Sequence, residues 1–124
     1  MNYRFVILWM LFNHVLDDYF LQGCLANLKQ RSYWIQNAPE KMYQYDHIMA
    51  LFMHSISWTF MIMLPVAYYV QFNIPFQFVI VFICNVLLHM VIDDLKANEK
   101  KINLCEDQCF HLFQILLTAI CAIK

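Results

Sequence analysis

The chain of 124 residues is poor in charged residues, glycine and proline. Only 14% of its residues are charged, and it has one glycine and three prolines. These counts exclude an intrinsically disordered chain, which would be rich in charge and poor in apolar residues. They also exclude collagen-like and low-complexity classes. The net charge of −1 gives no general affinity for polyanions, so no nucleic-acid partner is expected.

The cysteines lack the pattern of a metal or disulfide framework. Their number, five, is odd, and no two of them form a CxxC pair. A zinc ribbon and a disulfide scaffold are therefore not expected. We interpret the cysteines as reduced thiols that mostly take part in packing.

Apolar residues make up 62% of the chain, with eleven Phe and eight Met among them. Small soluble domains bury a small share of their surface, so a membrane is the natural place for this excess. The apolar residues gather in four stretches, at about residues 3–21, 46–70, 75–95 and 104–123. Each is close to the ~20 residues that a helix needs to cross a bilayer. We predict an all-α fold in which residues 1–124 form one membrane domain, a four-helix transmembrane bundle with up-down-up-down connectivity.

The connections between these stretches predict an orientation. Residues 22–45 are polar and aromatic, which favours a short interfacial helix between spans 1 and 2, with Trp34 at headgroup level. Six of the eight Lys and Arg residues fall in the first and third connections, and the other two are Arg4 and Lys124. We therefore expect a multi-pass membrane protein with both termini outside and the basic connections in the cytoplasm. The first stretch lacks a cleavage site and is interrupted by carboxylates, so we do not interpret it as a signal peptide.

Histidine and aspartate recur inside the predicted spans at helical spacing. The pairs are His14 with Asp18, His89 with Asp93, and Asp107 with His111, and the second span carries His47 and His54. Residues four apart share one face of a helix. In an up-down-up-down bundle these pairs fall in one layer near the cytoplasmic face, with His54 deeper. A single pair of this kind would more simply be an ion pair or a cap, but three pairs at one depth favour a site.

Such a layer is costly unless it is satisfied. An Asp at mid-membrane costs about 2.5–3.5 kcal/mol, so these groups must pair, face water or bind a cation. Imidazole with carboxylate suits Zn, Mn or Fe better than Ca or Mg, and helix bundles build di-metal sites from such pairs. We therefore expect one or two divalent ions, with metal ligands drawn from His14, Asp18, His47, His54, His89, Asp93, Asp107 and His111. We expect Asp17, Asp94 and Gln108 to orient these ligands, and Lys96 and Gln22 to contact a substrate as catalytic residues.

Three motifs resemble an uncharacterised family of small four-span membrane proteins of bacteria and their phages. They are HVLDDYFLQ with His14, Asp18, Tyr19 and Gln22, then HMVIDDLK with His89, Asp93 and Lys96, and DQCFH with Asp107, Gln108 and His111. The resemblance covers nearly the whole chain and implies a membrane protein that phages could carry. It implies no activity.

Three functions fit this pattern. The first is a membrane-embedded metal-dependent hydrolase acting on a phosphoester, either a lipid headgroup or a cytosolic nucleotide. The second is a non-catalytic protein that binds another membrane protein, for example to interfere with a host defence or with superinfection, with a structural His/Asp layer. The third is a proton or metal pathway, which the apolar outer half of the first two spans disfavours. The chain could also form a homo-oligomer in the bilayer.

Overall fold

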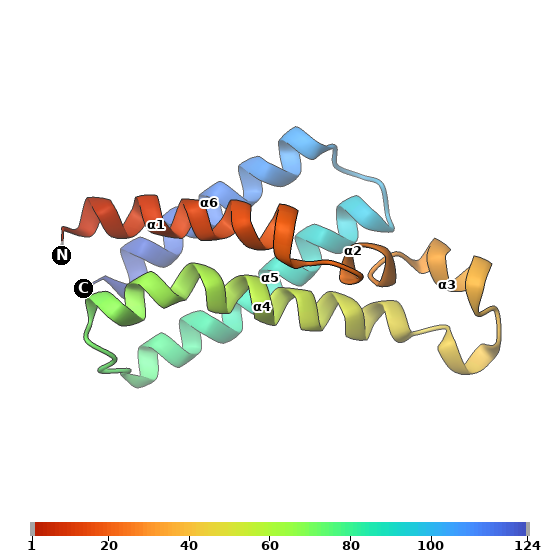
Figure 1. Cartoon of the computed structure of the whole chain (residues 1–124), viewed down its shortest axis with the longest axis horizontal. Helices are drawn as coiled ribbons and strands as arrows, with labels where there is room; N and C mark the ends of the chain where they lie inside the picture. The colour runs from red at the N-terminus through yellow and green to blue at the C-terminus, as the bar shows by residue number, and fades with distance from the viewer. Residues whose placement is uncertain (1, 124) are drawn as a thin grey trace.

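The computed structural model describes residues 2–123, and every regular element within them is a helix. The all-helical prediction is confirmed. The four long helices are α1 (Tyr3–Leu16), α4 (Asp46–Tyr69), α5 (Phe76–Ala97) and α6 (Leu104–Ala122), close to the four predicted stretches. The two chain ends and the α4–α5 turn lie at one end of the molecule, while α3 and the α5–α6 connection lie at the other (Figure 1). Lys124, which was counted in the charge prediction, lies outside the described residues.

Two of the helices are long and apolar enough to cross a membrane, one ending at Tyr69 and the other spanning Phe76–Ala97. The α-helical part of α1 has 14 residues, which at 1.5 Å per residue gives about 21 Å, less than the ~30 Å of a hydrocarbon core. Helix α6 is long enough but begins with polar residues that include Glu106 and Asp107. The four-span arrangement therefore stays a prediction, and for α4 and α5 the structure shows only that length and composition suit a membrane span.

A π-helical turn, η1 (Asp17–Leu21), continues α1. The amide of Gln22 donates to the carbonyl of Asp17 at 3.1 Å, five residues back, so the turn is wider than an α-turn. Both Asp17 and Asp18 are buried as a result. Single π turns are rare and often occur at functional sites.

The connection after the π turn is also helical. Gly23, the one glycine of the chain, adopts a left-handed backbone (φ 52°) that costs glycine little, and the chain turns there. Helices α2 (Leu25–Leu28) and α3 (Arg31–Asn37) follow, and then a 3₁₀ turn, η2 (Lys41–Tyr43). The predicted short helix between the first two stretches is thus present, and whether it lies at a membrane interface stays a prediction.

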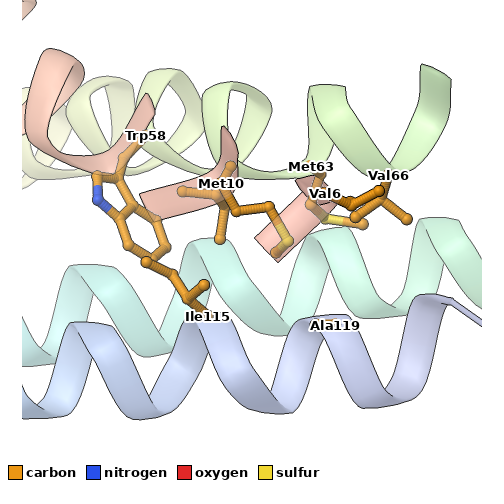
Figure 2. Close-up of a cluster of buried hydrophobic side chains, with 8 residues drawn as sticks. Val6, Met10, Trp58, Met63, Val66, Ile115 and Ala119 are labelled. Carbon is orange, nitrogen blue, oxygen red and sulfur yellow. The ribbon is translucent and has the colours of Figure 1, made fainter. Parts of the chain in front are cut away.

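The apolar core lies among α1, α4 and α6. It consists of Val6, Met10, Trp58, Ile62, Met63, Val66, Ile115 and Ala119. The members on one helix are mostly four residues apart, because that spacing places side chains on one face. Figure 2 shows the side chains of α1 and α4 facing those of α6, with Trp58 at one end of the cluster. Trp58 marks the border between this core and the polar layer described below.

Pro65 interrupts the hydrogen-bond ladder inside α4. Proline has no N–H, so the carbonyl four residues earlier, that of Met61, loses its helical partner. The side-chain amide of Asn13 on α1 donates to this carbonyl at 2.8 Å. The contact fastens α1 to α4 beside the apolar core, because Met61 lies between the core residues Trp58 and Ile62.

The outer surface of the bundle is strongly apolar. Phe20 is 74% exposed, Phe76 is 78% exposed, and Phe12 and Phe113 are each more than 60% exposed. All five cysteines are free thiols, but each is exposed, so the prediction that they mostly take part in packing is wrong within this chain. They lie on outward faces, where the apolar surface is.

Candidate metal centre

Six buried side chains from four segments form three overlapping groups that could hold a metal ion. The groups are Asp18 with His54 and His89, then His89 with Asp93 and His111, and Asp18 with Asp107 and His111. Within each group the ligand atoms lie within 4.8 Å of one another. The side chains come from η1, α4, α5 and α6, so the centre joins all four predicted spans.

His54 stands at one side of the centre. Its Nε2 lies 3.3 Å from Nε2 of His89 and 3.4 Å from both Asp18 Oδ1 and Asp93 Oδ2. Its ring is fully buried, so these neighbours replace water around the nitrogen. One imidazole nitrogen thus faces a second imidazole and two carboxylates, which is a ligand set typical of Zn, Mn or Fe.

His111 stands at the other side. Its Nε2 lies 3.4 Å from Asp93 Oδ1 and 3.3 Å from Asp107 Oδ1, and the ring is fully buried. Neither ring nitrogen makes a hydrogen bond of good geometry within the described part of the chain. Asp93 therefore bridges the two sides, because one of its carboxylate oxygens faces His54 and the other faces His111.

A series of side-chain hydrogen bonds connects the apolar core to the carboxylates of the centre. The indole N–H of Trp58 donates to Nδ1 of His14 at 2.8 Å, and Nε2 of His14 lies 3.0 Å from Oε1 of Gln108. The proton of His14 is therefore on Nε2 and is donated to Gln108. The amide of Gln108 in turn donates to Asp18 Oδ2 at 3.2 Å and to Asp107 Oδ2 at 3.0 Å. This series of hydrogen bonds fixes the orientation of two carboxylates of the centre.

Asp17 lies on the other nitrogen of His54. Its Oδ2 is 3.8 Å from His54 Nδ1, and its Oδ1 accepts a hydrogen bond of 2.6 Å from the hydroxyl of Ser57. A carboxylate behind a histidine can fix the ring tautomer so that the opposite nitrogen is free to ligate. At 3.8 Å the contact is too long for a hydrogen bond, so the orienting role of Asp17 stays a prediction.

Two lysines contact the carboxylates of the centre. Lys29 Nζ lies 2.6 Å from Asp93 Oδ2, and Lys96 Nζ lies 2.7 Å from Asp107 Oδ2. The Lys29 side chain is 12% exposed and that of Lys96 is 36% exposed. Lys96 is the more exposed of the two, so the centre comes closest to the surface beside Lys96 and Asp107.

The charges and unpaired atoms fit a divalent cation. Four buried carboxylates, those of Asp17, Asp18, Asp93 and Asp107, face two ammonium groups, which leaves two negative charges when the histidines are neutral. Buried atoms that lack a hydrogen-bond partner among residues 2–123 cluster here, including Asp107 Oδ1 and both nitrogens of His111. A buried charge or polar atom of this kind needs a partner, and a cation supplies one.

Seven predicted site residues lie outside the three groups. Asp17, Lys96 and Gln108 contact members of the groups, and the other four are His14, Gln22, His47 and Asp94. Both nitrogens of His14 are engaged, so it supports the centre through Gln108. His47 is buried near Arg31 and does not reach the centre, because it lies about 10 Å from His54 along the helix axis. The amide of Gln22 donates to the backbone carbonyl of Asp18. Asp94 accepts a hydrogen bond from Asn98 at 2.7 Å.

Three supporting residues were not predicted from the sequence. Lys29 belongs to a connection 64 residues from Asp93, so no spacing rule joins them. Ser57 and Trp58 are ordinary helix residues whose polar atoms meet the centre only after α4 packs on α1. Trp58 also stacks on His89 with ring centroids 4.1 Å apart. The expected depth of His54 also needs correction, because His54 joins the layer whereas His47 does not.

The chain was compared with models of protein families, with curated proteins and with solved structures, and nothing matched in any of the three comparisons. The resemblance stated above therefore stands on its three motifs alone. The site must be interpreted from its own geometry.

Proposed function

We propose that this protein is a membrane-embedded, metal-dependent hydrolase that acts on a phosphoester. One observation carries the proposal. Three histidines and three aspartates form three overlapping groups, and within each group the ligand atoms lie within 4.8 Å of one another. All six side chains are at most 7% exposed, so they form a preorganised cluster and not a chance surface gathering.

The membrane part of the proposal is supported by the outer surface. Phenylalanines such as Phe20 and Phe76 stand more than 70% exposed on helices whose interior is polar. An apolar exterior around a polar layer is expected when hydrocarbon surrounds a bundle, because polar groups then turn inward. We place all four long helices in the bilayer, with the Lys29 and Lys96 end in the cytoplasm.

In this proposal each residue of the centre has a specific role in hydrolysis. Asp18, His54, His89, Asp93, Asp107 and His111 would hold one or two ions of Zn, Mn or Fe. A bound ion supplies a water of lowered pKa and polarises a phosphoryl oxygen. Gln108 holds the carboxylates of Asp18 and Asp107 in position by hydrogen bonds, and Asp17 places a carboxylate beside His54. Lys96, the most exposed charged group at the centre, neutralises charge on a phosphoryl group that approaches from the cytoplasm.

The proposal is tested by a hydrolysis screen on detergent-purified protein loaded separately with Zn, Mn or Fe. Chromogenic phosphomonoesters and phosphodiesters, together with phosphatidic acid, are the probes. We expect turnover with at least one metal and its loss to background in the His89→Ala/Asp93→Ala double variant. Turnover that survives in this variant would contradict the proposal.

The burial of the ligands favours a second candidate function. A centre whose six residues are at most 7% exposed can serve as a structural clamp. The protein would then be a non-catalytic membrane protein that binds another membrane protein through its apolar helix faces. In that case metal-free variants unfold in detergent, and no phosphoester is hydrolysed by a metal-loaded, well-folded wild type.

A further inference from the structure

An open surface pocket lies at the end of the bundle that carries Lys29 and Lys96, and none of the six metal-centre residues lines it. It has a volume of about 380 Å³ and is lined by Arg31, Gln44, Tyr45, His47 and Ile48. Arg31 starts α3, Gln44 ends η2, and the other three residues lie at the start of α4. These segments lie at the end opposite the chain termini (Figure 1). Only His47 among them was singled out from the sequence, as a metal ligand.

Arg31 brings an uncompensated positive charge to this cavity. Within residues 2–123 no carboxylate forms an ion pair with its guanidinium, although Glu40 lines a neighbouring cavity with it. The backbone at Arg31 is fixed, because its N–H donates to Asn98 Oδ1 at 2.7 Å. Asn98 is itself held by Asp94 at 2.7 Å. The side chain is therefore a free cation on an anchored backbone.

His47 contributes a buried atom that lacks a partner. The residue is 3% exposed, and its Nδ1 makes no hydrogen bond within the described chain. It lies in the first turn of α4, where Tyr45 is the N-cap and supplies no side-chain hydrogen bond. The start of a helix favours an anion, because its free N–H groups and dipole carry partial positive charge. Asp46 in the same turn and Asp94, whose charge also acts on His47, oppose this, so the attraction for an anion rests on Arg31.

We infer that this cavity binds the phosphate group of an anionic ligand, with Arg31 and His47 as the main donors. A guanidinium offers two parallel N–H groups to phosphate oxygens, and imidazole and the tyrosine hydroxyl can donate beside it. The shared chemistry is a phosphate monoanion or dianion, which either a phospholipid headgroup or free phosphate can supply. The inference does not depend on the hydrolase proposal, because none of these residues touches the metal centre.

Native mass spectrometry of the detergent-purified protein tests this inference. Phosphatidic acid and phosphatidylcholine are added separately, and inorganic phosphate is added as a competitor. We expect phosphatidic acid to bind more tightly than phosphatidylcholine or, if the natural source is soluble, inorganic phosphate to bind directly. Displacement of phosphatidic acid by inorganic phosphate indicates a soluble source, and phosphatidic acid that is not displaced indicates a lipid source. Either result supports a phosphate site.

Matched variants distinguish specific binding in this pocket from general electrostatic attraction to the basic connection. Arg31→Ala is expected to raise the apparent Kd at least about tenfold, as for the loss of one charge-assisted hydrogen bond. Lys41→Ala removes a charge from the same connection without lining the cavity and should leave the Kd unchanged. His47→Leu is the second variant, should Arg31→Ala fail to fold, and circular dichroism reports whether the bundle is intact. Equal weakening by Arg31→Ala and Lys41→Ala, or equal binding of both lipids with no phosphate binding, would overturn the inference.

Discussion

The indole N–H of Trp58 donates to Nδ1 of His14 at 2.8 Å, at the border between the apolar core and the polar layer. Through this bond a core residue sets the tautomer of His14 and, through Gln108, the orientation of two carboxylates. The relationship makes the core and the candidate metal centre interdependent.

Replacing Trp58 by Phe should therefore destabilise the protein. Phe keeps most of the ring area but leaves His14 Nδ1 buried without a donor, at a cost of about 1–3 kcal/mol. Chemical unfolding in detergent, followed by circular dichroism, measures this cost. Trp9→Phe is the matched control, because Trp9 is partly exposed and packs on Phe5 and Tyr68. A Trp58 variant no less stable than the Trp9 variant would contradict the assigned bond.

The contact of Asn13 with Met61 gives a second prediction. Asn13→Ala should lower the free energy of unfolding by about 1–3 kcal/mol, because the Met61 carbonyl loses its donor. Pro65→Ala restores the N–H that normally serves this carbonyl. In the Pro65→Ala background, Asn13→Ala should therefore cost less, and a double-mutant cycle measures the difference. Strictly additive effects of the two substitutions would show that Asn13 does not replace the lost helical bond.

Much of the centre could be predicted from helical spacing. The pairs His89 with Asp93 and Asp107 with His111 each share a helix face, and the structure brings both pairs into the centre. Helical spacing does not predict a contact where the helix is irregular or where the partner is far away in the sequence. The π turn at Asp17 buries two consecutive carboxylates, which a regular helix would not align, and His14 turns toward Gln108.

The second span shows the same limit of spacing. His47 and His54 share a face of α4, but two turns separate them by about 10 Å, so only one can join a compact centre. Which one does so depends on where α4 sits against α5, and packing decides this. Lys29 reaches Asp93 because the α2–α3 connection is fastened to Asn98, a long-range contact without a sequence pattern.

Metal binding should raise the thermal stability of the folded protein. A ligand that binds only the folded state stabilises it by about 2.7 kcal/mol at a hundred times its Kd. We expect the Tm in detergent to rise with added Zn or Mn and to fall with a chelator. His111→Gln should abolish this dependence on metal, whereas His47→Gln should keep it, because His47 lies outside the three groups. Equal loss of the metal-dependent rise in Tm in both variants would show that His47 is also a metal ligand.

The orientation in the membrane gives a separate prediction. Reporter fusions after residue 124 should be active outside the cytoplasm, and reporters inserted in the α5–α6 connection should be active inside it. The reason is the excess of Lys and Arg in the first and third connections. A fusion at the C-terminal end that is active in the cytoplasm would contradict the orientation while leaving the metal centre untouched.

The most direct test of the central claim is metal content, measured by mass spectrometry on purified wild type, Asp93→Asn and Asp94→Asn. The two variants make the same chemical change one residue apart. Asp93 bridges both sides of the centre, whereas Asp94 accepts a hydrogen bond from Asn98, which an asparagine oxygen can also accept. We predict one or two ions of Zn, Mn or Fe per chain in wild type and Asp94→Asn, with loss in a folded Asp93→Asn protein. A well-folded wild type that holds no metal after supplementation would contradict the claim.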